Sequence, residues 1–149
     1  MADIEQVKKL REETGVSISE CKMALEEAEG EPDRAKEILR EKGIELAGKR
    51  ADRAAAQGIV ESYIHPNKRV GVLLELRCES DFVARSVEFQ KLAHDICLQI
   101  AAMNPIFVTA LLSQPWIKDP QKTIKVILEE AMAAIGENII IKAFSRYEI

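Results

Sequence analysis

The sequence lacks a long apolar run, a strong excess of one charge and a secretory start. Its apolar stretches fall well short of the ~20 residues that a membrane-spanning helix requires. The 21 basic and 25 acidic side chains alternate along the chain, so its net charge of −4 presents no basic field to nucleic acid. Residues 1–5 (MADIE) lack the basic start and the following apolar run of a secretory signal. We therefore expect a cytoplasmic protein that binds neither a membrane nor nucleic acid.

Cysteine is scarce, and its spacing argues against a cysteine-based site. Cys21, Cys78 and Cys97 are odd in number and form no Cys-x-x-Cys pair. Each falls on an expected apolar face, which favours buried free thiols in a reducing compartment.

Signatures of catalysis and of metal binding are also missing. His65 and His94 are the only histidines, and neither has a partner set with useful spacing. A Cys78–His65–Asp81 group is conceivable if a hairpin and its exit bring the three together, but nothing indicates an activated thiol. No set of ligands has metal spacing, and no phosphate-binding or dinucleotide-binding fingerprint is present. The sequence therefore predicts no enzyme, no cofactor and no metal site.

Residues 1–43 predict a head of three short helices. The first ends near Thr14-Gly15, because glycine is a common helix stop. The second opens with a capping-box pattern at residues 17–20 (SISE). The third starts at Pro32 and ends at Gly43. Three helices in ~40 residues bury little apolar surface, so we expect the head to be only modestly stable alone. With residues 15–18 (GVSI) between its first two short helices, the head resembles the small three-helix module of ubiquitin-associated domains.

Residues 44–57 predict a helical connector that Gly58 ends. The segment is rich in alanine and carries Lys49, Arg50 and Arg53, which extend a basic patch from Lys42. No aromatic side chains are interleaved to stack on nucleic-acid bases, so a solvated connector face is the better interpretation of this patch.

From residue 58 the hydrophobic period changes from that of helices to that of strands. Two strands, Ile59–His65 and Val70–Cys78, predict a hairpin around the turn at 66–69. The elements expected to cover and complete it are a helix from Ser86 to Asn104, a short turn or helix with Trp116 within 106–118, a helix from Asp119-Pro120 to Gly136, and a third strand at 138–147.

These elements define an α+β fold class. The predicted units are a small three-helix, ubiquitin-associated-like head (1–43), a helical connector (44–57), and a core (58–149) in which a three-stranded antiparallel sheet packs with helices.

The corner at residues 79–85 (ESDFVAR), between the hairpin and the next helix, is the strongest candidate site. A corner that only has to turn would use glycine, asparagine or proline, whereas this one carries Phe82 between Asp81 and Arg85. Phe82 either fills the local core or projects as a wedge, a side chain that enters a slot in a partner protein. The corner alone favours the core.

The loop between the first two head helices, at residues 15–18 (GVSI), is a second candidate. A head with so little core presents loops and helix ends to a partner rather than a pocket. Ile18 either contacts such a partner or packs only against its own helix, and the pattern leaves both interpretations open.

Three motifs together resemble the bacterial elongation factor Ts family. Residues 10–15 (LREETG) with 21–25 (CKMAL) are similar to its head motif. Residues 77–85 (RCESDFVAR) are similar to its signature of a polar pair before Asp-Phe-Val-Ala. Residues 135–139 (IGENI) are similar to the motif that opens its last core strand. The motifs occur in the family's order and spacing and cover nearly the whole chain.

The resemblance implies a nucleotide-exchange factor for the GTPase elongation factor Tu. It implies that the head contacts the nucleotide-binding domain of the GTPase and that the Asp81-Phe82 corner enters beside the nucleotide and its magnesium ion. Phe82 would then be a wedge. Ser80 and Asp81 would hold neighbouring polar groups, and Arg85 would orient the corner. The implied partner-binding residues are Val16, Ile18 and Ser19 in the head and Ser80, Asp81, Phe82, Val83 and Arg85 at the corner. The alternative function is a non-catalytic helical module that tethers another partner.

The chain also departs from the family pattern. Ile18-Ser19 stands where the family often has two methionines, and Lys142-Ala143 where it commonly has two basic residues. Longer members insert a helical segment and append a second core subdomain, whereas this chain passes from Asn104-Pro105 to Trp116 in a few residues. Short members of the family dimerise through the core, so the resemblance implies a homodimer formed in that way.

Overall fold

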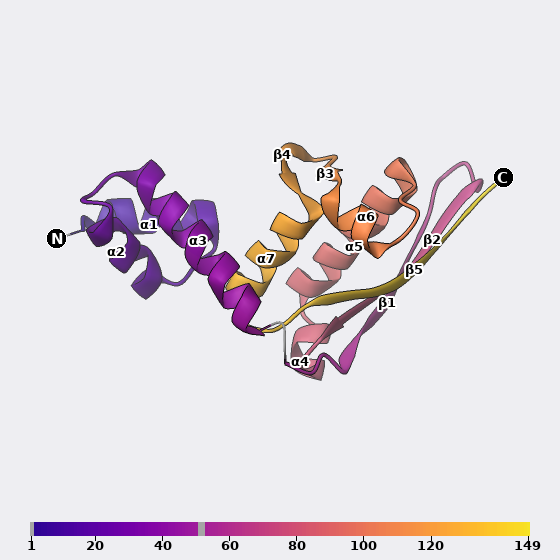
Figure 1. The fold of residues 1–149 in the computed structure, drawn as a ribbon, viewed down its shortest axis with the longest axis horizontal. Coiled ribbons are helices and arrows are strands. Elements are labelled where there is room, and N and C mark those ends of the chain that lie inside the picture. The colour runs from indigo at the N-terminus through magenta and orange to yellow at the C-terminus, as the bar shows by residue number, and fades with distance from the viewer. Residues whose placement is uncertain (1, 51–52) are drawn as a thin grey trace.

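The computed structural model describes residues 2–50 and 53–149, with the side chains of 2–43 and 53–149. Three N-terminal helices lie at one end of the molecule and a three-stranded antiparallel sheet packed with helices lies at the other (Figure 1). The predicted α+β fold is confirmed. The elements are α1 Ile4–Thr14, α2 Ile18–Glu27, α3 Pro32–Arg50, β1 Gln57–Ile64, β2 Val70–Cys78, α4 Asp81–Ala84, α5 Val87–Met103, α6 Val108–Ser113, β3 Pro115–Trp116, β4 Asp119–Thr123, α7 Ile124–Ile135 and β5 Ile140–Glu148.

The end of α1 and the start of α2 lie where their local capping residues predict. Gly15 ends α1 in the left-handed conformation (φ 71°), and its N–H donates to the Arg11 carbonyl at 2.8 Å. Ser17 caps α2 by accepting a hydrogen bond from the N–H of Glu20 at 3.3 Å. The three helices enclose their own small core: Val7, Leu10, Cys21, Ala24, Leu25, Ala28, Ala35 and Leu39.

The predicted end of the third helix at Gly43 is wrong, because α3 continues through Gly43 to Arg50. A glycine inside a helix costs about 1 kcal/mol relative to alanine, which tertiary packing can offset. Gly43 is buried where α3 packs on α7, and a Cβ at this position would lie 3.5 Å from the Cβ of Ala133. Packing against α7 therefore outweighs the local preference to stop.

The predicted helical connector at residues 44–57 also differs from the structure, because α3 takes up its first part. Its first residues, 44–50, continue α3, residues 51–52 lie outside the described part of the chain, and residues 53–56 are not helical. Gly58 therefore ends no helix. It lies in β1 with φ 151° and pairs with Arg77 of β2. The boundaries proposed for the head and the connector stay predictions.

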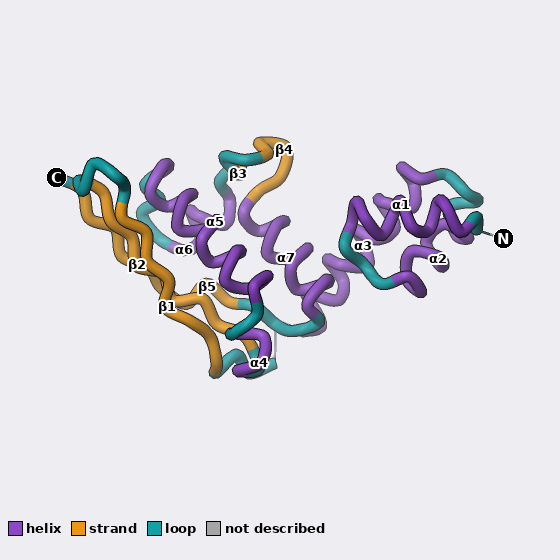
Figure 2. Tube along the Cα trace, turned by 180° about the vertical axis from the view of Figure 1, so that it is seen from behind, coloured by secondary structure: helices purple, strands orange, loops and turns teal. Residues whose placement is uncertain are grey.

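The sheet has the order β1-β2-β5, with both pairs antiparallel. Helices α5, α6 and α7 lie on one side of it (Figure 2). The central strand, β2, points alternate residues into the core beneath these helices, as the alternation predicts. The most deeply buried members of this core are Leu74, Leu76, Cys78, Phe89, Ala93, Ile96, Cys97, Ile100, Leu111 and Ile124.

The predicted start of the last helix at Asp119-Pro120 is wrong. Asp119–Thr123 forms β4, which pairs with β3, and α7 begins at Ile124 with Thr123 as its cap. The buried Gln99 of α5 holds this small hairpin, since its amide donates to the Pro115 carbonyl at 3.0 Å and accepts from the Ile117 N–H at 2.9 Å. These bonds from another helix override the local helix-start signal.

Two further expectations can be compared with the structure. All three cysteines are buried and free, as predicted. Within the described ranges, no helix is both long and apolar enough to cross a membrane.

Candidate functional site

Phe82 projects from the corner into solvent. It lies on α4, a single turn that begins directly after β2, and its side chain is 86% exposed. The interpretation that the corner alone favoured, in which Phe82 fills the core, is therefore wrong. The next two residues fill the core instead, since Val83 is 9% and Ala84 1% exposed. The turn thus buries one side and presents Phe82 on the other.

The other predicted residues of the corner surround Phe82 at its base. Ser80 caps α4, and its hydroxyl accepts a hydrogen bond from the Val83 N–H at 3.2 Å. Asp81 and Arg85, both exposed, form an ion pair of 2.9 Å one turn apart. Exposed pairs of this kind contribute little stability and can exchange partners at low cost. Because Val83 is buried, it can contribute to a partner site by anchoring the turn.

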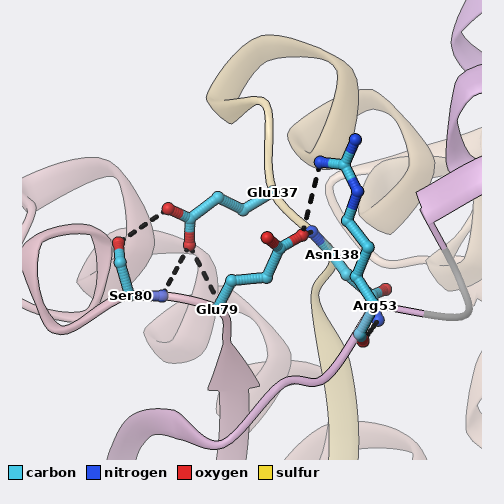
Figure 3. Close-up of polar contacts among 5 residues, drawn as sticks. All are labelled: Arg53, Glu79, Ser80, Glu137 and Asn138. Carbon is cyan, nitrogen blue, oxygen red and sulfur yellow. Dashed lines mark hydrogen bonds and ion pairs between the residues drawn. The ribbon is translucent and has the colours of Figure 1, made fainter.

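A reciprocal pair of carboxylates joins the corner to the loop before β5 (Figure 3). Glu137, in the loop between α7 and β5, accepts hydrogen bonds from the N–H of Glu79 at 3.0 Å and of Ser80 at 2.9 Å. The Ser80 hydroxyl donates to the same carboxylate at 2.6 Å. In return, the Glu79 carboxylate accepts from the N–H of Asn138 at 2.7 Å and lies 3.7 Å from the Arg53 guanidinium. Each of the two loops therefore satisfies backbone donors of the other.

The sequence analysis placed Glu79 in the corner without giving it a role, and it did not identify Glu137 and Asn138 as part of the site. The three residues lie within two of the recognised motifs, but no periodicity links residues so far apart in the chain. An available signal was the predicted antiparallel sheet. If the third strand pairs with the second, the end of the second lies beside the start of the third. The structure has this order, with Arg77 of β2 paired with Ile140 of β5, and this brings the two motifs together.

The head residues form a second surface, away from the corner (Figure 1). Val16 is half-buried, Ser19 is exposed, and Ile18 is 54% exposed. Ile18 lines a surface groove of about 580 Å³ on the head, beside Ile4 and the basic side chains of Lys8, Arg11 and Lys22. Since half of Ile18 stays accessible, it is available to a partner.

The conceivable Cys78–His65–Asp81 group does not form. The register pairs Ile64 with Gly71 and Gln57 with Cys78, so His65 and Cys78 lie at opposite ends of the hairpin. Burial raises the pKa of the Cys78 thiol above its usual range, and the nearby Glu137 carboxylate raises it further. The thiol donates to the Ser80 carbonyl at 3.2 Å and is a buried structural group.

The described side chains also show no metal centre. Across residues 2–43 and 53–149, no three or more histidine, cysteine or acidic side chains are grouped so that they could hold a metal ion.

Comparison with known proteins identifies one family. The family model described as elongation factor TS matches residues 4–111. Elongation factor Ts of Caldanaerobacter subterraneus subsp. tengcongensis is 38% identical to the chain, with 99% of the chain and 96% of the relative covered. Elongation factor Ts of Carboxydothermus hydrogenoformans is 40% identical, with 100% of the chain and 89% of the relative covered.

The relatives differ from the chain in length. The alignments run over 193 and 194 positions, whereas the chain has 149 residues. More than 40 aligned positions therefore have no residue of this chain opposite them.

Proposed function

The chain belongs to the elongation factor Ts family, the nucleotide-exchange factors of elongation factor Tu in translation elongation, and we propose that its Asp81-Phe82 corner drives GDP release. As a member of this family it is a cytoplasmic exchange factor and not an enzyme. The observation that carries the proposal is the 86% exposure of Phe82 on a capped turn anchored to the core.

Phe82 can act as a wedge because its apolar surface is solvated before the partner binds. Moving this largely exposed phenylalanine into a slot of the GTPase, where it is fully buried, would contribute about 1.5–3 kcal/mol. Asp81 and Arg85 flank it and can re-pair with polar groups beside the nucleotide and its magnesium ion. The corner would thus favour the state of the GTPase from which nucleotide and magnesium have been displaced.

Exchange then follows from linkage and needs no bond to be made or broken. A factor that binds the nucleotide-free GTPase more tightly than the GDP-bound form weakens GDP binding by the same factor. Each tenfold change requires about 1.4 kcal/mol of differential binding, so burial of Phe82 can supply one to two such steps. Stopped-flow release of a fluorescent GDP from elongation factor Tu, with the wild-type chain and Phe82→Ala, tests the proposal.

The head supplies a second contact through Val16, Ile18 and Ser19. A contact remote from the nucleotide raises the affinity of the complex and leaves the corner to act on the bound GDP. With the family shown, the alternative of a helical module that tethers another partner loses its support.

Ile18→Lys should weaken binding of the chain to elongation factor Tu by about tenfold or more, because it places a charge where an apolar side chain would be buried. The melting temperature should change little, since Ile18 is 54% exposed. Met23→Lys, also on α2 and 53% exposed but outside the groove, is the matched control. Equal calorimetric affinities of the two variants would refute the contact at Ile18.

We also propose that two copies of the chain pair through the face of the sheet that the helices leave open. This face exposes Val60, Ile64, Leu73 and Tyr147, by 71, 57, 52 and 77%. Leu73 lies between Ser62 and Ser145 of the neighbouring strands. The next row of this face holds Ile64, Gly71 and Tyr147, so Leu73 is a diagonal neighbour of Ile64 and Tyr147. Such a face is self-complementary about a two-fold axis and can pack against its copy as two aligned sheets.

The charges on this face support a second copy of the chain as its occupant. Glu75 and Arg77 of β2 both point to the open face and form an ion pair there. A two-fold axis crossing β2 lets each Glu75 also face Arg77 of the partner subunit, so that no like charges need to be apposed.

Leu73→Lys should convert the dimer to a monomer in light scattering coupled to size exclusion, because it would place an unpaired charge in the apolar part of the paired faces. Ile106→Lys, at an 87% exposed position in the loop before α6, should stay dimeric. A monomeric wild-type chain, or a dimeric Leu73→Lys, would contradict pairing through this face.

A further inference from the structure

The direction of Phe82 depends on its backbone, because nothing packs around its side chain. The ring is 86% exposed, and α4 has four residues, too few to be a stable helix by itself. The groups that fix the ends of this turn therefore decide where the ring points. Val83 and Ala84 anchor its inner side in the core.

At the start of the turn, several hydrogen bonds come from one carboxylate, that of Glu137. It binds two consecutive backbone N–H groups, those of Glu79 and Ser80, at the point where β2 ends. It also accepts from the Ser80 hydroxyl, whose oxygen in turn accepts from the first turn of α4 at the Val83 N–H. A single charged group thus fixes the exit direction of the strand and the orientation of the helix cap.

The position of Glu137 is itself restrained from the corner. Its chain neighbour Asn138 is buried, donates its backbone N–H to Glu79, and donates its side-chain amide to the Arg53 carbonyl at 2.9 Å. The loop before β5 and the corner after β2 therefore form one unit, visible in Figure 3, rather than two loops that move separately.

We infer that Glu137 is a positioning residue for nucleotide exchange, which acts by holding the turn that presents Phe82. This inference rests on the proposed function, in which Phe82 is the wedge. Glu137 itself is partly buried and need not touch the GTPase. Its removal should leave Phe82 exposed but no longer held in one direction.

Glu137→Gln is the principal test, because it keeps the shape of the side chain but removes its charge and one acceptor oxygen. The maximal rate of GDP release from elongation factor Tu at saturating factor should fall about tenfold or more, as expected for a misplaced acting group. The factor concentration at half-maximal rate should change less than about threefold, since the head surface is unaltered. Glu130→Gln, an exposed acidic residue of α7 paired with Lys122, is the matched control and should behave as wild type.

A double-mutant cycle separates positioning from a general loss of structure. If Glu137 acts through Phe82, then Glu137→Gln combined with Phe82→Ala should release GDP no more slowly than Phe82→Ala alone. Effects that multiply would show that Glu137 acts independently of the wedge and would overturn the inference. A wild-type rate for Glu137→Gln would overturn it as well.

Ser80 provides the second route if Glu137→Gln is unfolded at the assay temperature. Ser80→Ala loses the hydroxyl that joins the carboxylate to the cap, and it should slow exchange in the same way. Ser80→Thr keeps that hydroxyl and should restore the wild-type rate. Equal rates for the two variants would refute a role for the hydrogen bond between Ser80 and Glu137. Failure of the proposed function gives a different result, in which wild type does not accelerate release or Phe82→Ala matches wild type.

Discussion

Phe82→Ala is expected to slow the release of GDP from elongation factor Tu, relative to the wild-type factor, by about tenfold or more. The substitution removes the apolar surface that the wedge would bury in the GTPase. It should change the free energy of unfolding by less than about 0.5 kcal/mol, because the 86% exposed ring has few contacts to lose. The measurements are stopped-flow fluorescence of labelled GDP and thermal unfolding of the same samples.

The control for this prediction is an alanine substitution of another apolar side chain that is equally exposed. Ile106→Ala removes an 87% exposed apolar side chain from the loop before α6 and should exchange nucleotide as wild type does. If Phe82→Ala releases GDP at the wild-type rate, Phe82 does not act as a wedge. A melting temperature lowered by more than about 5 °C would instead show that the ring stabilises the fold, since about 1 kcal/mol shifts a chain of this size by 2–4 °C.

Local capping signals predicted much of the fold because their chemistry is complete within a few residues. Gly15 and Gly136 end their helices in the left-handed conformation, and Ser17 and Ser86 cap theirs with side-chain oxygens. The strand Val70–Cys78 was predicted with its observed bounds, because strict alternation leaves one register that buries its apolar face.

The errors arose where a distant group overrides a local signal. Asp119-Pro120 has the chemistry of a helix start, but Gln99 of α5 binds the backbone of β3 and favours a hairpin there. Gly43 could end a helix, but α7 provides a surface on which the helix continues. Neither partner is close enough in sequence for a local pattern to reveal it.

The candidate site was predicted in composition but not in arrangement. The motif around Phe82 marked the corner, yet its pattern alone favoured burial, and the resemblance to the family was needed to favour exposure. The hydrogen bonds that Glu137 accepts at the corner join residues that are 57 or 58 positions apart in the sequence. They follow from the pairing of β2 with β5 rather than from any motif. The motifs contain the residues of the site, and the pairing of β2 with β5 makes these residues neighbours.

Gly58→Ala should lower the free energy of unfolding by about 2–4 kcal/mol, the largest stability effect expected for a single methyl group in this chain. The residue has φ 151°, a conformation that other residues rarely adopt. A Cβ there would lie 2.2 Å from the Leu76 carbonyl oxygen and 2.8 Å from the Arg77 Cα, both rigid backbone atoms of the central strand. The strand must therefore shift or unpair, and urea unfolding would measure the loss.

Gly43→Ala is the matched control, because the same substitution meets the opposite environment. It lies inside α3, and its new methyl group would make an ordinary contact of 3.5 Å with the Cβ of Ala133. Alanine is the better helix former by about 1 kcal/mol, so stability should stay constant or rise by up to that amount. Losses of similar size from both variants would show that flexibility, and not the backbone geometry at Gly58, is what glycine provides. Opposite signs would assign the loss to the close approach of β1 and β2, directly beside the corner that presents Phe82.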